Sequence, residues 1–411
     1  MKKIELLAPA GNKDKLETAF YFGADAIYFA GKQYGLRAFS ENFELDELKN
    51  YVDYAHKMDK KAYITVNILA HNSDFVGLSD YLSFLQEIKV DALIISDPGI
   101  LRYALKYAPN VEIHLSTQAN CTNFESAKFW VDNGVKRLIL ARELSLTEIS
   151  EIREHIDDNI ELETFVHGAM CISYSGRCLL SNYLAGRDSN RGACVQACRW
   201  EYTICEKSRQ NDKYEIQQDE KGTYILNSKD LNMLEHLDKI VKAGVTSLKI
   251  EGRMKTTYYV ANVVNAYRRA LNILLKGGEY KIDENLKAEL LKCSHRKYTT
   301  GFYLGANDKE NIESSAPVSS YEFIANVVES NDVENGFAKV EQRNRFKVGD
   351  KLEILSPSEN FNKEFIVNKM TDEKGNDLID ALKVQQIINL ECPFKLYKGD
   401  CLRIKKEIES E

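Results

Sequence analysis

The sequence predicts an α/β fold: a (β/α)₈ TIM-like barrel with a Cys-rich insertion after its seventh strand, followed by a small C-terminal β-barrel domain. From the N-terminus to about residue 278, short apolar runs rich in β-branched residues alternate eight times with amphipathic stretches. Several of the amphipathic stretches end at glycines typical of helix C-termini, namely Gly23, Gly134, Gly244 and Gly277. Eight strand-then-helix repeats favour a parallel sheet that closes into a barrel.

The eight strands are expected, in chain order, at residues 4–7, 26–29, 63–69, 92–96, 112–116, 137–140, 160–166 and 247–250. The helices are expected at residues 13–22, 45–56, 78–89, 100–107, 124–132, 146–155, 231–243 and 257–275. The structural alternative is an open, doubly wound sheet. Such a sheet often carries a Gly-rich phosphate loop after its first strand, but that turn reads APAGNKDK and lacks G-x-G-x-x-G.

The pattern changes after the barrel. We expect the barrel over residues 1–280, with the insertion at 167–223, then a transition segment at 281–315 and the β domain at 316–411. From about Tyr321, short apolar runs are separated by turn signals around Gly336, Gly349 and Gly375. This spacing is typical of a small all-β domain.

The composition is that of an ordinary soluble protein. Of the 411 residues, 44% are hydrophobic and 28% are charged, and no run approaches the roughly 18 uncharged apolar residues of a membrane helix. The first residues read as a strand rather than a signal peptide, so we expect a cytoplasmic protein with nine reduced cysteines. The formal net charge of −7 argues against a uniformly basic nucleic-acid surface and leaves room for a local basic patch.

Active sites of such barrels lie at the C-terminal ends of the strands and in the loops that follow. Four candidate catalytic residues occupy those positions: Asn67, Gln118, His167 and Glu251. Any one of them alone is as readily explained as a loop cap. Because all four are expected at the same end of the barrel, together they favour an active site there.

Residues 171–198 of the insertion after the seventh strand hold four of the nine cysteines: Cys171, Cys178, Cys194 and Cys198. Isolated cysteines are usually small buried hydrophobes, whereas four on one loop favour a bound metal or cluster. Their spacings of six, fifteen and three residues differ from the C-x₂-C knuckles common in structural zinc sites. Iron–sulfur clusters accept looser spacings, so we predict a cluster and keep zinc as the alternative.

The same insertion is locally basic. Between Cys171 and Arg199 it contains a single acid, Asp188, and four arginines: Arg177, Arg187, Arg191 and Arg199. Lys249 and Arg253 extend this charge from the eighth strand. Because arginine pairs bidentately with carboxylates and phosphates, we predict an anion-binding rim, with ordinary solvated loop charge as the alternative.

Hydrolase motifs are missing from the sequence, which contains neither H-E-x-x-H nor G-x-S-x-G. A nucleophile pair of Cys171 with His167 is a further possibility. A thiolate committed to a metal is not free to attack a peptide, which weighs against that pair.

The insertion resembles the signature of the collagenase-like peptidases, peptidase family U32. The resemblance rests on Glu163-x-Phe165-x-x-Gly168-Ala169-Met170-Cys171, four residues, then Gly176-x-Cys178-x-Leu180-Ser181. Other similar blocks are APAGN near the start, TVN ending in Asn67, STQ ending in Gln118, KIEGRMK from Lys249 and HRKYTTGF from His295. Together these blocks span about 300 residues in order, and the tail is similar to the family's C-terminal β domain.

The resemblance implies two activities. The family was named for proteolysis, without agreed catalytic residues. Several members instead carry a [4Fe–4S] cluster on four cysteines and serve oxygen-independent hydroxylation. Members similar to this chain in length and domain order hydroxylate the tRNA wobble uridine to 5-hydroxyuridine and depend on prephenate.

Carried over by resemblance, the cluster ligands are Cys171, Cys178, Cys194 and Cys198. Some members take the fourth ligand from the position occupied here by Asn232, which favours Cys198 in this chain. Glu163, in the signature, joins the candidate catalytic residues. The arginines would hold tRNA phosphates or the two carboxylates of prephenate.

The leading hypothesis is therefore a tRNA-modifying hydroxylase that uses an iron–sulfur cluster and takes prephenate as a possible co-substrate. The rivals are a U32-type peptidase and a non-catalytic module with a structural zinc. A second family member as partner and the oligomeric state stay open.

Overall fold

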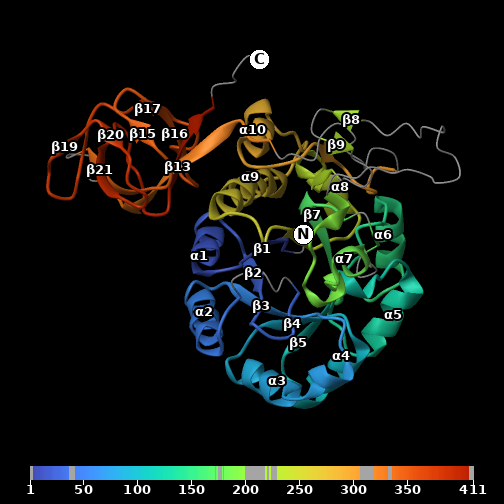
Figure 1. The fold of residues 1–411 in the computed structure, drawn as a ribbon. Coiled ribbons are helices and arrows are strands. Elements are labelled where there is room, and N and C mark those ends of the chain that lie inside the picture. The colour runs from blue at the N-terminus through green and yellow to red at the C-terminus, as the bar shows by residue number, and fades with distance from the viewer. Residues whose placement is uncertain are drawn as a thin grey trace, which may run out of the picture.

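The computed structural model describes residues 3–36, 42–171, 173–174, 178, 180–199, 218–219, 222–223, 229–305, 318–331 and 336–406. Eight parallel strands form its larger unit: β1 (Glu5–Pro9), β2 (Ala26–Phe29), β3 (Lys61–Val66), β4 (Ala92–Ile95), β5 (Glu112–Leu115), β6 (Arg137–Ile139), β7 (Glu161–Ala169) and β11 (Ser247–Ile250). They follow one another in chain order, and β11 closes the barrel by pairing with β1 and β7 (Figure 1). The predicted barrel is confirmed.

Helices surround the barrel: α1 (Lys13–Tyr21), α2 (Leu45–Lys57), α3 (Leu78–Glu87), α4 (Pro98–Tyr107), α5 (Phe124–Asp132), α6 (Leu146–Glu154), α8 (Leu237–Lys242) and α9 (Thr257–Leu275). The first shows how they form. Asn12 caps α1, and its Oδ1 accepts a hydrogen bond from the amide of Lys15 at 3.0 Å. Leu16, Ala19 and Phe20 recur at helical spacing and are buried against the barrel.

The chain between β7 and β11 differs from the prediction. A helix was expected at 231–243, but the chain first forms β10 (Asp230–Asn232), which is antiparallel to β7. The nine-residue β7 runs past its neighbours, and β10 pairs with the backbone of Gly168 and Ala169 at its end. The insertion itself contains α7 (Leu180–Ala185), β8 (Gln218–Asp219) and β9 (Gly222–Thr223).

After α9, part of the transition segment packs on the barrel. It contains α10 (Glu284–Glu289) and β12 (Tyr298–Thr299). Because β12 pairs with β10, this segment extends the barrel sheet beyond β7.

The C-terminal unit is a separate antiparallel β domain (Figure 1). Its strands are β13 (Tyr321–Glu329), β14 (Phe337–Gln342), β15 (Phe346–Lys347), β16 (Lys351–Leu355), β17 (Glu364–Ile366), β18 (Met370–Thr371), β19 (Asp377–Leu378), β20 (Asp380–Ala381), β21 (Ile387–Glu391) and β22 (Cys401–Lys405). Eight of them form one sheet in the order β17-β16-β22-β13-β14-β21-β18-β19, and β15 pairs with β20. A separate β domain was expected here.

A buried ion pair joins the two units. Arg403 on β22 donates to both carboxylate oxygens of Glu289 on α10, at 2.6 and 2.8 Å, and both side chains are 0% exposed. Asn262 of α9 donates to the same carboxylate at 2.8 Å. This buried ion pair therefore anchors the β domain to the helices around the barrel.

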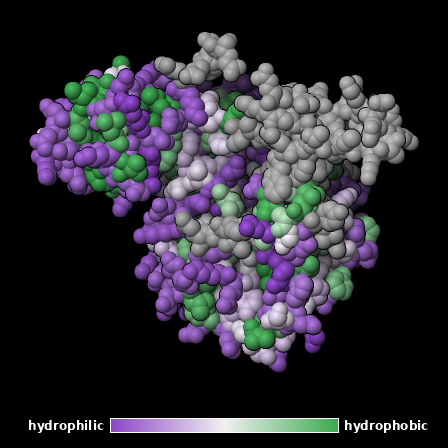
Figure 2. Space-filling view, in the orientation of Figure 1, coloured by the Kyte–Doolittle hydropathy of each residue, from purple (hydrophilic) through white to green (hydrophobic). Residues whose placement is uncertain are grey.

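Hydrophilic residues cover much of the face shown in Figure 2, as the composition predicts. Within the described ranges, none of the helices combines the length and the hydropathy of a membrane span.

Candidate functional site at the barrel mouth

We call the barrel end formed by the C-terminal ends of the strands the mouth. Hydrogen bonds connect the loops at this mouth. Asn67 follows β3, and its Oδ1 accepts from the amide of Leu36 at 3.3 Å. Its Nδ2 donates to Ser116 Oγ at 3.1 Å, and Ser96 Oγ donates to the Asn67 carbonyl at 3.1 Å. Asn67 thus lies at the mouth, as predicted, and joins the loops after β2, β3 and β5.

Gln118 lies on a 3₁₀ turn, Thr117–Ala119, directly after β5. The turn is held on both sides, because Ser116 Oγ accepts from the Gln118 amide at 3.3 Å and Thr117 Oγ1 donates to the Leu140 carbonyl at 3.1 Å. Two side-chain oxygens of this turn, Gln118 Oε1 and Asn120 Oδ1, are shielded from solvent and have no hydrogen-bond partner within the described ranges. Buried polar atoms are normally paired, so this pair is an exception that needs a reason.

His167 lies near the C-terminal end of β7 and is buried among tyrosines. Its ring lies 5.3 Å from the ring of Tyr267, 5.5 Å from Tyr298 and 6.0 Å from Tyr259. Burial lowers the pKa of His167 to about 3, so the imidazole is neutral at physiological pH. Its Nδ1 lies 3.3 Å from Tyr267 Oη.

Glu251 follows β11 at the mouth and is half-buried. Its amide donates to the His167 carbonyl at 2.9 Å, and its carbonyl accepts from Tyr259 Oη at 3.0 Å. The backbone of Glu251 is thereby fixed beside the end of β7.

Arg253 is 4% exposed, so it differs from a solvent-facing anion-binding residue. Its guanidinium donates to the Leu36 carbonyl at 2.9 Å, to Asn42 Oδ1 at 2.5 Å and to Thr65 Oγ1 at 3.5 Å. It holds the loop after β2 against the mouth.

The structure places Glu163 and Lys249 inside the barrel rather than on the rim. Lys249 Nζ lies 2.7 Å from Glu163 Oε1, and the two residues are 3% and 0% exposed. Arg137 at the start of β6 donates to Glu163 Oε2 at 2.9 Å. Burial raises the pKa of Glu163, but the charges of Lys249 and Arg137 outweigh it and hold that pKa below its ordinary value. The ammonium of Lys249 is thus committed to Glu163, which corrects its placement in an anion-binding rim.

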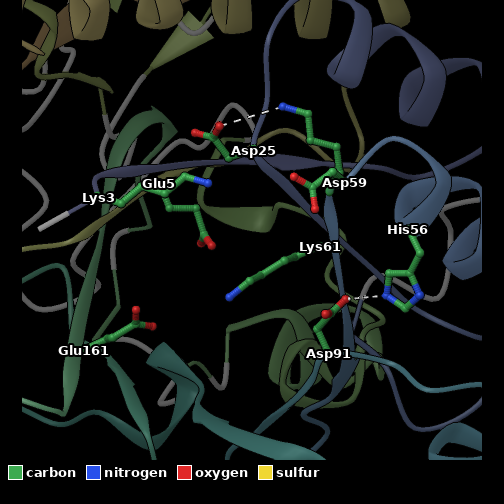
Figure 3. Close-up of a pocket in the computed structure, with 9 residues that line it drawn as sticks. Lys3, Glu5, Asp25, His56, Asp59, Lys61, Asp91 and Glu161 are labelled. Atoms are coloured by element: carbon green, nitrogen blue, oxygen red, sulfur yellow. Dashed lines mark hydrogen bonds and ion pairs between the residues drawn. The ribbon is translucent and has the colours of Figure 1, made fainter.

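A charged pocket opens at the opposite end of the barrel (Figure 3). It is lined by residues at the N-terminal ends of the strands: Lys3, Glu5, Asp25, His56, Asp59, Lys60, Lys61, Asp91 and Glu161. Four of its five acids, Glu5, Asp25, Asp91 and Glu161, form ion pairs; for example, His56 Nε2 lies 3.0 Å from Asp91 Oδ2. Barrel enzymes place their chemistry at the other end, so we assign this pocket to barrel stability.

The insertion is fastened to the mouth through Arg191. Its guanidinium binds Asp74 bidentately at 2.6 and 2.9 Å, and it donates to the Leu69 carbonyl at 2.9 Å. Arg191 was predicted to bind anions, but the structure commits it to a carboxylate of this chain. Arg187 is exposed. Arg177 and the side chain of Arg199 lie outside the described residues.

None of the four candidate ligand cysteines is in a disulfide within the part of the chain that the structure describes; Cys171 is exposed, and Cys178, Cys194 and Cys198 are half-buried. The sulfur of Cys194 accepts from the amide of Gln196 at 3.4 Å and from Ser181 Oγ at 3.8 Å.

The pKa of Cys178 is lowered. Burial acts to raise it, but hydrogen bonds from the Ser189 and Ser173 hydroxyls and from the amides of Leu180 and Ser181 outweigh burial. Such donors stabilise a thiolate, the form in which cysteine binds iron.

Within the part of the chain that the structure describes, no three His, Cys, Asp or Glu side chains are arranged to hold a metal ion. The four sulfurs are therefore not gathered into a ligand set here, and cluster binding stays a prediction. The donor chemistry does fit a cluster, since none of the four described cysteines is in a disulfide and two of them have hydrogen-bond donors beside the sulfur.

Sequence reasoning missed three residues that the geometry brings to attention: Asn120, Asp74 and Tyr267. Asn120 carried a weak signal, because asparagine tolerates the left-handed backbone that it adopts here at φ 55°. Asp74 and Tyr267 reach the site only through tertiary contacts, which periodicity does not reveal.

The sequence model of Peptidase family U32 matches residues 11–313, and that of the Peptidase family U32 C-terminal domain matches residues 319–403. The chain is 40% identical over 406 residues to tRNA hydroxylation protein P1 of Bacillus subtilis, covering 98% of this chain and 95% of that protein. It is 38% identical over 418 residues to tRNA hydroxylation protein P of Escherichia coli, covering 91% and 90%. It is 37% identical over 274 residues to a 23S rRNA 5-hydroxycytidine synthase of Escherichia coli, covering 67% of this chain and 40% of that protein.

Proposed function

The chain belongs to peptidase family U32, and from that premise we propose that it is an RNA-modifying enzyme that hydroxylates the wobble uridine of tRNA to 5-hydroxyuridine. The observation that carries the proposal is the similarity to tRNA hydroxylation protein P1, at 40% identity over 98% of this chain. Similarity to a 5-hydroxycytidine synthase supports hydroxylation of a pyrimidine in RNA.

The proposal includes a [4Fe–4S] cluster on Cys171, Cys178, Cys194 and Cys198. It is supported by the position of these four cysteines on one insertion, by the absence of a disulfide among them in the described residues, and by the hydrogen bonds to the Cys194 sulfur. When bound, the cluster would supply the electron transfer that amino-acid side chains cannot. Bringing the four sulfurs together would require the insertion to rearrange when it takes up iron, because the described residues hold no preformed ligand set.

The residues of the mouth would bind and orient the nucleotide. Asn67 and Arg253 hold Leu36, which follows β2, and Asn67 also holds Ser116, which follows β5, so a base entering the mouth would meet these residues at fixed positions. His167 is neutral and buried, which suits a hydrogen-bonding role better than that of a general base near pH 7. The wobble base is unpaired, so moving it to the mouth costs little unstacking.

Prephenate is proposed as the co-substrate. Its two carboxylates would need basic partners, and Arg187 on the insertion is exposed. Binding of tRNA by a chain of net charge −7 would rest on local basic patches and would weaken steeply with salt.

Complementation tests the proposal. The chain is expressed anaerobically in an Escherichia coli strain that lacks tRNA hydroxylation protein P, and tRNA nucleosides are measured by mass spectrometry. We expect the hydroxyuridine derivatives to reappear in the tRNA of this strain. They should stay absent when the host also lacks a step in the synthesis of prephenate. No return despite soluble, iron-loaded protein would overturn the proposal.

The peptidase alternative makes a different prediction. It requires peptide hydrolysis by metal-free protein that survives Cys194→Ser. Such hydrolysis, with no change in tRNA nucleosides, would replace the hydroxylation proposal.

A further inference from the structure

The turn after β5 is rigid but presents two unsatisfied acceptors. Its backbone is tied on one side to Ser116 and on the other to β6, through Thr117 Oγ1 to the Leu140 carbonyl and the Ala141 amide to the Cys121 carbonyl at 3.2 Å. Among the residues that the structure describes, Gln118 Oε1 and Asn120 Oδ1 nonetheless have no hydrogen-bond partner, and both atoms are shielded from water. A shielded acceptor without a donor costs about 1–3 kcal/mol of folding free energy.

Two neighbouring polar side chains at the mouth are satisfied. The Asn67 amide bonds Leu36 and Ser116, and the Ser96 hydroxyl bonds the Asn67 carbonyl.

Asn120 adds a second cost at the same turn. It is a non-glycine residue in the left-handed region, at φ 55° and ψ 47°. Its amide donates to the Thr117 carbonyl at 3.0 Å and fixes this conformation. Strained backbone and unpaired polar atoms on a rigid loop are typical of a preorganised binding site.

We propose that Gln118 and Asn120 determine substrate specificity by binding the donor groups of the target nucleotide; this inference rests on the proposed function. A uridine nucleotide brings two donors, the base N3–H and the ribose 2′-hydroxyl, which match the two acceptors in number. Cytosine has an acceptor at N3 and carries its donor on the exocyclic N4 amino group instead, so an oxygen placed opposite N3 would meet an acceptor and stay unsatisfied. The N–H₂ end of the same carboxamide suits a carbonyl oxygen that flanks N3–H in uracil.

The test measures binding, so it needs neither cluster nor turnover. RNA anticodon stem-loops carry uridine, cytidine or 2′-deoxyuridine at the wobble position, and affinity is read by fluorescence anisotropy. The full-length wild type should bind the uridine loop about threefold to tenfold more tightly than each loop that lacks one donor. The two preferences are for uridine over cytidine and for uridine over 2′-deoxyuridine. Gln118→Met and Asn120→Gly should each abolish one of them and keep the other, as a double-mutant cycle requires. Glycine accepts the left-handed backbone, and Gln118→Glu serves as a second, isosteric variant.

Gln86→Met is the matched control. Gln86 is a half-buried glutamine on α3 whose Oε1 is paired, accepting from the Asn110 amide at 3.0 Å. Gln86→Met should lower the melting temperature and leave both preferences intact, whereas Gln118→Met should not lower the melting temperature, because it removes an unpaired acceptor.

The outcomes separate the two proposals. If the wild type binds none of the stem-loops, the proposed function fails. If it prefers the uridine loop and every folded variant keeps both preferences, the specificity role of Gln118 and Asn120 is overturned and the proposed function stands.

Discussion

Arg191 and Asp74 form a bidentate ion pair that fastens the Cys-rich insertion to the loop after β3. The adjacent residues strengthen the connection, since the Leu69 amide donates to the Asn190 carbonyl at 3.0 Å. Asn190 Nδ2 and Ser189 Oγ in turn both donate to the Cys178 carbonyl at 2.9 Å. The position of Cys178 is therefore set from the barrel mouth through a short chain of polar contacts.

We expect Arg191→Lys to loosen the insertion without unfolding the barrel, because lysine cannot bind Asp74 with two parallel hydrogen bonds. Iron content after anaerobic reconstitution should fall at least severalfold, while the far-UV circular dichroism spectrum stays unchanged. Lys128→Gln is the control, since it removes an exposed ion pair with Glu125 on α5. Full iron retention in Arg191→Lys would show that the ion pair does not position the cysteines.

Cys194→Ser should abolish cluster binding and hydroxylation while leaving the barrel folded, because Cys194 lies on an insertion outside the barrel strands. The broad absorbance near 400 nm expected of a reconstituted cluster should disappear. Cys293→Ser, in a buried cysteine away from the insertion, should keep the absorbance. A colourless wild type with stoichiometric zinc would contradict the cluster.

The order of strands and helices was predictable because burial imposes a period on each element: Leu16, Ala19 and Phe20 fill one face of α1. The cysteine-rich insertion was recognisable from its composition. What periodicity could not reveal were pairings between distant residues. Lys249 looks like a mouth residue in sequence, yet its ammonium turns inward to Glu163. β10 forms only because the end of β7 offers unpaired backbone groups.

Glu163→Gln should destabilise the barrel strongly. The Glu163 carboxylate is fully buried and balances Lys249 and Arg137, so neutralising it leaves buried positive charge. Breaking a buried ion pair in this way costs about 3–5 kcal/mol. Chemical denaturation measures this loss. If the Glu163→Gln variant kept its stability but lost hydroxylation, Glu163 would again be a candidate catalytic residue.

Glu5 should make barrel stability depend on acid pH. Burial raises the pKa of Glu5, but the charge and hydrogen bonds of Arg137, with further hydrogen bonds from Tyr63 and Ser247, outweigh it and lower that pKa to about 2. The pKa of a glutamate in the unfolded chain is about 4.3. The ionised carboxylate therefore stabilises the fold fully above about pH 4.3, and this contribution, on the order of 3 kcal/mol, is lost as the pH falls toward about 2.

Urea unfolding of Glu5→Gln and wild type at pH 6, 4 and 3 checks this dependence. The stability difference between them should shrink as the pH falls. Glu17→Gln, at a partly exposed position on α1, should parallel the wild type. A constant difference across this range would show that Glu5 does not carry the effect.

Arg403→Met should uncouple the β domain from the barrel. It removes both hydrogen bonds to Glu289 and leaves that carboxylate buried beside α9, at a cost of about 3–5 kcal/mol. Calorimetry should then resolve two unfolding transitions where the wild type shows more cooperative melting. Adding Glu289→Gln to Arg403→Met should recover part of the loss, because it removes a buried carboxylate that keeps, among the described residues, only Lys292, at 3.2 Å, as a charged partner. A single unshifted transition in Arg403→Met would mean that the apolar contacts between the two units hold them together without this pair.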